Sequence, residues 1–182
     1  MTQAGSGARS ANLLNVFGIL IKDALAVRDI PDADAGPSET AALITIASYP
    51  GQTIKTLAAI IGLSHSAAVR LIEKLVERDL VRVVRGVDRR RAAVSITPGG
   101  EAVVAAILAH RRGRLMAILG SLDDAETKTL TRLMEKIIGA QTKSVAYGDR
   151  LCRACDLANC PQDVCPVEQQ ACRLGALASL PA

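Results

Sequence analysis

The chain has 182 residues, which is enough for one domain with extensions but not for two full domains. Apolar residues make up 49% of the chain and charged residues 22%, with one phenylalanine, two tyrosines and no tryptophan. The core must therefore be aliphatic, which favours helices over an aromatic-rich β-sandwich. The net charge is a modest +4. The two histidines, His65 and His110, argue against histidine-dependent hydrolases and histidine-rich catalytic metal sites, and we expect the protein not to be an enzyme.

No apolar run reaches the roughly 18 residues that a transmembrane helix needs. The first eleven residues are small and polar and lack the apolar core of a signal peptide. We therefore expect a cytoplasmic protein with no membrane partner. In that compartment, clustered cysteines are more often metal ligands or redox thiols than structural disulfides.

The N-terminal part predicts two helices separated by a loop. Residues 1–11 are rich in Gly, Ser and Ala and predict a disordered N-terminus. Apolar residues at helical spacing predict an amphipathic helix over 12–28, and a segment with two prolines and a glycine predicts the loop that follows. Ser38 is the expected N-cap of a second helix over 39–48.

Residues 53–78 have the pattern of a helix-turn-helix. Thr53 can cap a short helix that runs to residue 61, and Gly62 suits the tight turn after it. Ser64 can cap the next helix, over 66–78. Two short helices joined by a turn that contains glycine are typical of this DNA-binding motif.

A two-stranded hairpin and two long helices are predicted next. Residues 80–85 and 92–97 alternate as strands around a charged tip, which together predict a β-wing. Thr97 and Pro98 begin a long helix over 99–119. Asp123 and Glu126 form a capping box for a last long helix that runs to about residue 146. The fold class is therefore mainly α with a two-stranded β-wing.

The whole excess of positive charge lies in residues 70–91, which hold eight basic and four acidic residues. One face of the helix over 66–78 carries Ala68, Leu71, Ile72 and Leu75 toward the core. The opposite face suits a DNA major groove: Arg70 can bind guanine or phosphate, Val69 a thymine methyl, and Ser64, His65 and Ser66 can meet phosphates. The alternative is an ordinary solvated helix surface.

The wing strengthens the DNA-binding interpretation. Four arginines gather on the narrow hairpin: Arg85, Arg89, Arg90 and Arg91. Such a tip fits a minor groove, whose negative potential attracts inserted arginine. Asp88 lies among them, and we expect it to pair with an arginine and fix its rotamer.

At these residues the sequence resembles the MarR (multiple antibiotic resistance regulator) family, over about residues 12–142. The specific part is the Asp-Arg-Arg wing followed by Ile-Thr-Pro-x-Gly. The matching residues are Leu57-Ala58, Gly62-Leu63-Ser64, Ala68-Val69-Arg70, Leu75, Asp79-Leu80-Val81, Asp88-Arg89-Arg90, Val94-Ser95-Ile96-Thr97-Pro98 and Gly100. Asp79 departs from the glycine usual in the family, although Asp tolerates a left-handed conformation better than most residues.

The resemblance implies a homodimeric winged-helix transcription regulator, often a repressor, that binds a pseudo-palindromic operator in double-stranded DNA. Asp88 would orient Arg90 into the minor groove. The helices at 12–28 and 124–140 would form the dimer. The implied organisation is a disordered segment (1–11), a dimerisation helix and loop (12–37), a winged helix (38–98), dimerisation helices (99–146) and a tail (147–182). Many family members bind phenolic acids, which allows a small-molecule effector here, with Phe17 and Tyr49 as the aromatic residues for its pocket.

The C-terminal tail is outside this pattern and holds all five cysteines: Cys152, Cys155, Cys160, Cys165 and Cys172. A Cys-x-x-Cys pair with two further cysteines can complete a tetrahedral S₄ metal site, and the first four are the most closely spaced. Zinc is the preferred cofactor; an iron–sulfur cluster, a metal-free disulfide switch and inert cysteines are the alternatives. The tail has little apolar periodicity, so we expect it to need a ligand to become ordered.

Because the tail directly follows the last predicted dimer helix, its metal or redox state can control DNA affinity by shifting the spacing of the two recognition helices. A structural zinc tail with no sensing role is the second hypothesis. A redox or electron-transfer protein is the third, and it leaves the basic wing unexplained.

Overall fold

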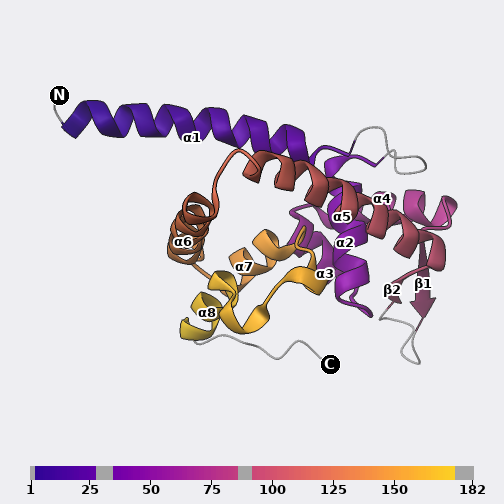
Figure 1. The fold of residues 1–182 in the computed structure, drawn as a ribbon. Coiled ribbons are helices and arrows are strands. Elements are labelled where there is room, and N and C mark those ends of the chain that lie inside the picture. The colour runs from indigo at the N-terminus through magenta and orange to yellow at the C-terminus, as the bar shows by residue number, and fades with distance from the viewer. Residues whose placement is uncertain (1–2, 28–34, 86–91, 175–182) are drawn as a thin grey trace.

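The computed structural model describes residues 3–27, 35–85 and 92–174. The chain is mainly helical, with one small sheet (Figure 1). Its elements in order are α1 (Gln3–Leu25), α2 (Pro37–Ser48), α3 (Ile54–Ile61), α4 (His65–Glu77), β1 (Val81–Arg85), β2 (Ala92–Ile96), α5 (Pro98–Leu119), α6 (Asp124–Gln141), α7 (Val145–Cys152), two 3₁₀ turns (Leu157–Asn159 and Gln162–Val164) and α8 (Pro166–Arg173).

The core lies where α2, α3, α4, the sheet and the first half of α5 meet. Its members are aliphatic, as the composition required, and include Leu43, Ile44, Leu57, Ile72, Leu75, Val81, Val94 and Ile107. The predicted inward face of α4 is confirmed, because Ala68, Ile72 and Leu75 are buried and Leu71 packs against the core. Burial of these side chains, more than helix propensity, stabilises the short helices α3 and α4.

The helix-turn-helix follows the predicted caps. The Thr53 side chain accepts a hydrogen bond from Thr56 N, and the Ser64 side chain accepts one from Ala67 N. Gly62 has a φ of 74°, which favours glycine in the turn between the helices. The second helix begins at His65, one residue earlier than expected.

The wing is an antiparallel pair in which Val81 is opposite Ile96 and Arg85 is opposite Ala92. Asp79 precedes it with a φ of 53°, the left-handed conformation expected from its alignment with a family glycine. The Asp79 carbonyl accepts a hydrogen bond of 2.6 Å from Thr97 Oγ1, which joins the two ends of the hairpin. Thr97 also caps α5 by accepting a hydrogen bond from Gly100 N.

Three predicted boundaries were wrong in this part of the chain. Helix α1 begins at Gln3 rather than residue 12, because residues 3–11 contain no proline to stop the helix. Gly36 is the N-cap of α2 and Pro37 occupies its first turn, so Ser38 is not the cap. Helix α6 has its predicted capping box at Asp123, but it ends at Gln141 rather than near residue 146.

The tail is more regular than the sequence suggested. Ser144 caps α7, and α7 and α8 pack together around the buried Val167 and Ala171. Gly148 lets them approach, since a Cβ atom at that position would lie 3.1 Å from Val167 Cγ1. Figure 1 shows α7 beside α3 and α8 beside α6, and the same pairs are in contact.

Among the described residues, no single helix is both long and apolar enough to cross a membrane. Helices α3 and α4 pass the length and composition test only when joined as a pair bent by 106°.

Candidate functional site

The N-terminal end of α4 presents an exposed polar surface. Ser64, His65 and Ser66 are all exposed there, and the hydroxyl groups of Ser64 and Ser66 lie 3.2 Å apart. Arg70 is exposed one turn further along the helix. Four of the predicted DNA-binding residues therefore lie together on one accessible end of the recognition helix, where backbone N–H groups also favour anions.

Val69 has a different environment from these four residues. It is half-buried and lines an apolar hollow with Ile54, Val76 and Val83, between α4 and the first strand of the wing. Its predicted contact with a thymine methyl group stays a prediction. Arg82, which the sequence reasoning did not select, is exposed on β1 and adds a cation to the wing.

The tip of the wing lies outside the described residues. This applies to Asp88, Arg89, Arg90 and Arg91, and also to the side chain of Arg85, which is the last residue of β1. Their predicted roles in the minor groove therefore stay predictions. The described strands do place the ends of the hairpin, at Arg85 and Ala92, opposite each other.

Ion pairs fix α4 against α2. Glu39 is almost fully buried, and its carboxylate binds Lys74 Nζ at 2.5 Å and Arg78 Nη1 at 3.3 Å. Removing one partner of such a pair costs more than the pair contributes, because the remaining charge stays partly buried. Glu39 therefore orients the recognition helix from behind, on the side away from Arg70.

The first four cysteines form two pairs of neighbouring thiols. Cys152 and Cys155 hydrogen-bond to each other, as do Cys160 and Cys165. The hydrogen bond from Cys152 holds the pKa of Cys155 down to about 7, and the same bond together with burial raises the pKa of Cys152. Cys172 differs from these four, because it is exposed and its thiol lies 3.9 Å from Glu168 Oε1.

The two thiol pairs lie near each other, because the charges of Cys160 and Cys165 also raise the pKa of Cys152. Burial and the charges of Cys152, Cys155 and Cys160 also raise the pKa of Tyr49 to about 12, so Tyr49 lies beside the thiols. Phe17, by contrast, lies partly exposed on α1. In the part of the chain that the structure describes, no three His, Cys, Asp or Glu side chains form a ready metal-binding group.

Besides the packing of α8 on α6, three contacts attach the cysteine segment to the rest of the chain. Thr45 Oγ1 of α2 donates a hydrogen bond of 3.4 Å to the Arg153 carbonyl, and Arg112 Nη2 of α5 binds Asp156 Oδ2 at 2.5 Å. The third contact is at the turn between α3 and α4, where a Cβ atom on Gly62 would lie 3.1 Å from Arg150 Nη2. Sequence reasoning missed this position of Arg150, because nothing in the spacing of residues 62 and 150 indicates contact.

Residues 34–92, which contain the helix-turn-helix and the first strand of the wing, match the sequence profile of the MarR family. This part of the chain is therefore similar to a MarR-family domain. The profile covers the predicted recognition helix and the Asp-Arg-Arg motif that distinguishes this domain from other helix-turn-helix domains. A comparison with curated proteins gave no match.

Solved structures show that the similarity extends beyond this domain. A MarR family protein from Bacillus stearothermophilus has a TM-score of 0.66 at 20% identity, covering 79% of this chain and 100% of that one. RV1404 from Mycobacterium tuberculosis has a TM-score of 0.62 at 20% identity, covering 78% and 95%. FabT from Streptococcus pneumoniae, in complex with DNA, has a TM-score of 0.60 at 14% identity, covering 72% and 94%. The chain therefore has the winged-helix fold of MarR-type transcription regulators.

Proposed function

We propose that the protein is a dimeric, sequence-specific DNA-binding transcription regulator that acts as a repressor. The observation that carries this proposal is the exposed polar end of α4 beside a basic wing, in a MarR-type fold. Arg70 supplies a donor for a guanine edge or a phosphate, and Ser64, His65 and Ser66 supply phosphate contacts. The neighbour FabT, solved with DNA, supports the same use of the fold.

The exposed apolar residues support a dimer. Along α1, Leu13, Leu14, Val16, Ile19 and Leu20 are between 48% and 65% exposed, and the main packing partner of this helix is α5. Figure 1 shows α1 extending away from the body of the chain. A long helix that leaves so much apolar surface in water needs a partner, and a second copy of the chain gives a symmetric one.

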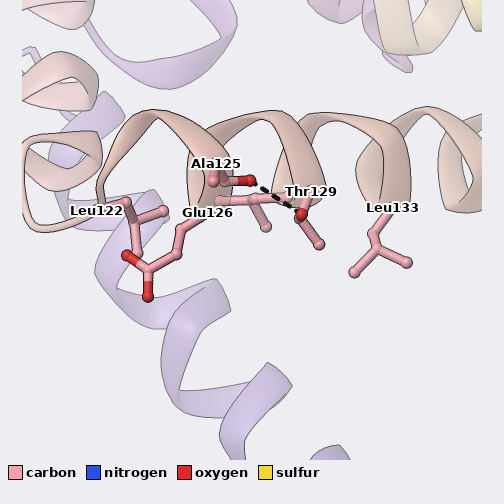
Figure 2. Close-up of a pocket in the computed structure, with 6 residues that line it drawn as sticks. Leu122, Ala125, Glu126, Thr129 and Leu133 are labelled. Atoms are coloured by element: carbon pink, nitrogen blue, oxygen red, sulfur yellow. Dashed lines mark hydrogen bonds between the residues drawn. The ribbon is translucent and has the colours of Figure 1, made fainter.

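Helix α6 adds apolar surface for the same interface. Figure 2 shows Leu122 and Leu133 on one side of α6, with Ala125 and Thr129 between them. These residues line an open hollow of about 440 Å³. Ile137 follows on the same helix and is 56% exposed. An open apolar hollow on an amphipathic helix is suited to side chains of a partner subunit.

The proposal includes control by the C-terminal cysteines, whose metal, iron–sulfur or redox state would set DNA affinity. Contacts from the cysteine segment to α2, α3 and α5 support this, because a change there reaches the DNA-binding lobe directly. A purely structural zinc tail predicts the opposite, namely DNA affinity that does not depend on the state of the thiols.

Direct DNA binding tests the proposal. The full-length protein first selects a DNA duplex from a pool of random sequences. The selected, fluorescently labelled duplex is then titrated with the protein, and binding is followed by fluorescence anisotropy. Arg70→Ala should weaken binding by ~1–3 kcal/mol in each half-site. The matched control is Arg114→Ala, which removes the same charge from an exposed position on α5. Equal affinities for the two variants, or failure to enrich any duplex, would contradict the proposed function.

A further inference from the structure

The backbone presents the first four cysteines as two compact turns. Cys155 N donates a hydrogen bond of 2.9 Å to the Cys152 carbonyl, which closes the Cys-x-x-Cys turn at the end of α7. Cys160 and Cys165 each end a single 3₁₀ turn, and Cys165 is also the N-cap of α8. Both pairs are half-buried. This arrangement places four soft sulfur donors on two neighbouring turns, and the two pairs would have to close together to hold one metal ion.

Charges of both signs surround these thiols, because Asp156 and Glu168 act on Cys155 and Cys160 while arginines flank Cys152 in sequence. Arg150 and Arg153 flank Cys152, the Arg153 side chain hydrogen-bonds to the Arg150 carbonyl, and Arg112 pairs with Asp156 next to Cys155. A divalent ion held by four thiolates carries a net charge of −2 and releases four protons as it forms. Arg153, which is next to Cys152 in sequence, can offset part of that charge.

We propose that Cys152, Cys155, Cys160 and Cys165 together bind one zinc ion, with Cys172 outside the site, and that the bound metal holds Arg150 against the turn between α3 and α4. The two thiol pairs close around the metal, which fixes the last turn of α7 because Cys152 is the final residue of that helix. The second half of this inference rests on the proposed DNA-binding function; the first half does not.

Arg150 is the link between the thiols and DNA. Its guanidinium lies at Gly62, two residues before Ser64, the N-cap of the recognition helix. Arg150 is exposed, so its charge adds to the anion-attracting end of α4. Metal loading therefore raises DNA affinity by keeping one more cation beside the phosphate backbone, and metal loss releases it.

Metal content tests the first half without any DNA. Full-length protein loaded with zinc and desalted should retain about one zinc per chain and stay colourless. Cys152→Ser should lose the metal, whereas the matched control Cys172→Ser should retain it. Circular dichroism checks that both variants are folded, and thiol alkylation gives an independent readout in which zinc protects four cysteines and leaves Cys172 reactive. Equal loss of zinc in both variants, disulfides in place of metal, or a brown iron-containing protein would overturn the zinc assignment.

DNA affinity tests the second half. Removing zinc from the wild-type protein should weaken binding to the selected duplex by about tenfold, a coupling typical of linked sites. Arg150→Ala should bind zinc normally and lose this metal dependence, whereas Arg173→Ala, a matched charge loss on α8, should keep it. If Arg150→Ala responds to zinc as the wild type does, the coupling through Arg150 is wrong. If no form of the protein binds DNA while the four-cysteine zinc site is intact, the proposed function has failed and the metal site has not.

Discussion

The sharpest consequence of the proposed dimer concerns Leu13, in the middle of α1. Its side chain is 56% exposed in the single chain, so replacing it removes few contacts inside that chain. Alanine also has the highest helix propensity, so Leu13→Ala should leave α1 helical. The substitution therefore acts on association and not on folding.

The size of the effect follows from the exposed fraction. Burying a whole leucine side chain contributes about 1.5–3 kcal/mol, so covering the exposed half contributes ~0.8–1.7 kcal/mol per chain. A two-fold interface uses each residue twice, which gives ~2–3 kcal/mol for the dimer. The dimer dissociation constant of Leu13→Ala is therefore expected to be about 30- to 150-fold higher than that of the wild type.

Sedimentation velocity over a dilution series measures this constant. The matched control is Val84→Ala, which shortens an apolar side chain that is 43% exposed on β1, in neither α1 nor α6. The reasoning fails if both variants dimerise as the wild type does, or if wild-type protein is monomeric throughout the series. A melting temperature lowered in Leu13→Ala by the same amount at all protein concentrations would also contradict it, because that result would place Leu13 in the core of its own chain.

Two further predictions concern α5. Gly100→Ala should destabilise the fold by about 1–3 kcal/mol, because a Cβ atom there would collide with the Leu80 carbonyl. Gly113→Ala in the same helix places its Cβ atom within 4 Å of nothing and should stabilise the fold by ~0.5–1 kcal/mol. Thermal unfolding distinguishes the two variants, and equal melting temperatures would refute the packing at Gly100. Arg112→Ala breaks the ion pair with Asp156 and should speed proteolysis of the tail without changing the global melting temperature by more than about 2 °C; an unchanged cleavage rate would show that this pair does not hold the tail.

The winged helix could be predicted from sequence because its boundaries are set by local chemistry. Thr53, Ser64, Thr97 and Asp123 each cap the helix that was expected from them, and each does so through its own side chain. These hydrogen bonds span only three residues, so the sequence contains all the information needed. The left-handed conformation of Asp79 could likewise be predicted from a single residue, because Asp79 aligns with a glycine of the family.

The tail could not be predicted in the same way because it is stabilised by contacts distant in sequence. Its small core combines Thr142, Gly148, Val167 and Ala171, and these residues do not form a helical or strand pattern of apolar residues in the sequence. The start of α1 was missed for a related reason, since its small residues match a frayed terminus as well as a helix. The structure places Ser64, His65, Ser66 and Arg70 together on α4, and their contact with DNA stays a prediction. Only the folded chain shows Arg150 at Gly62, in the turn before this helix.

The position of the tail also changes the expected route of control. If the tail only extended the last dimer helix, a change at the cysteines would reach DNA through the spacing of the two subunits. Instead, α8 packs on α6 while α7 packs on α3, so one small unit contacts both the proposed dimer surface and the helix-turn-helix. The thiols lie between these two contacts, at the end of α7 and the start of α8. If the proposed control by the thiols is right, a change at the thiols can therefore reach the helix-turn-helix through the contact of α7 with α3, within one chain.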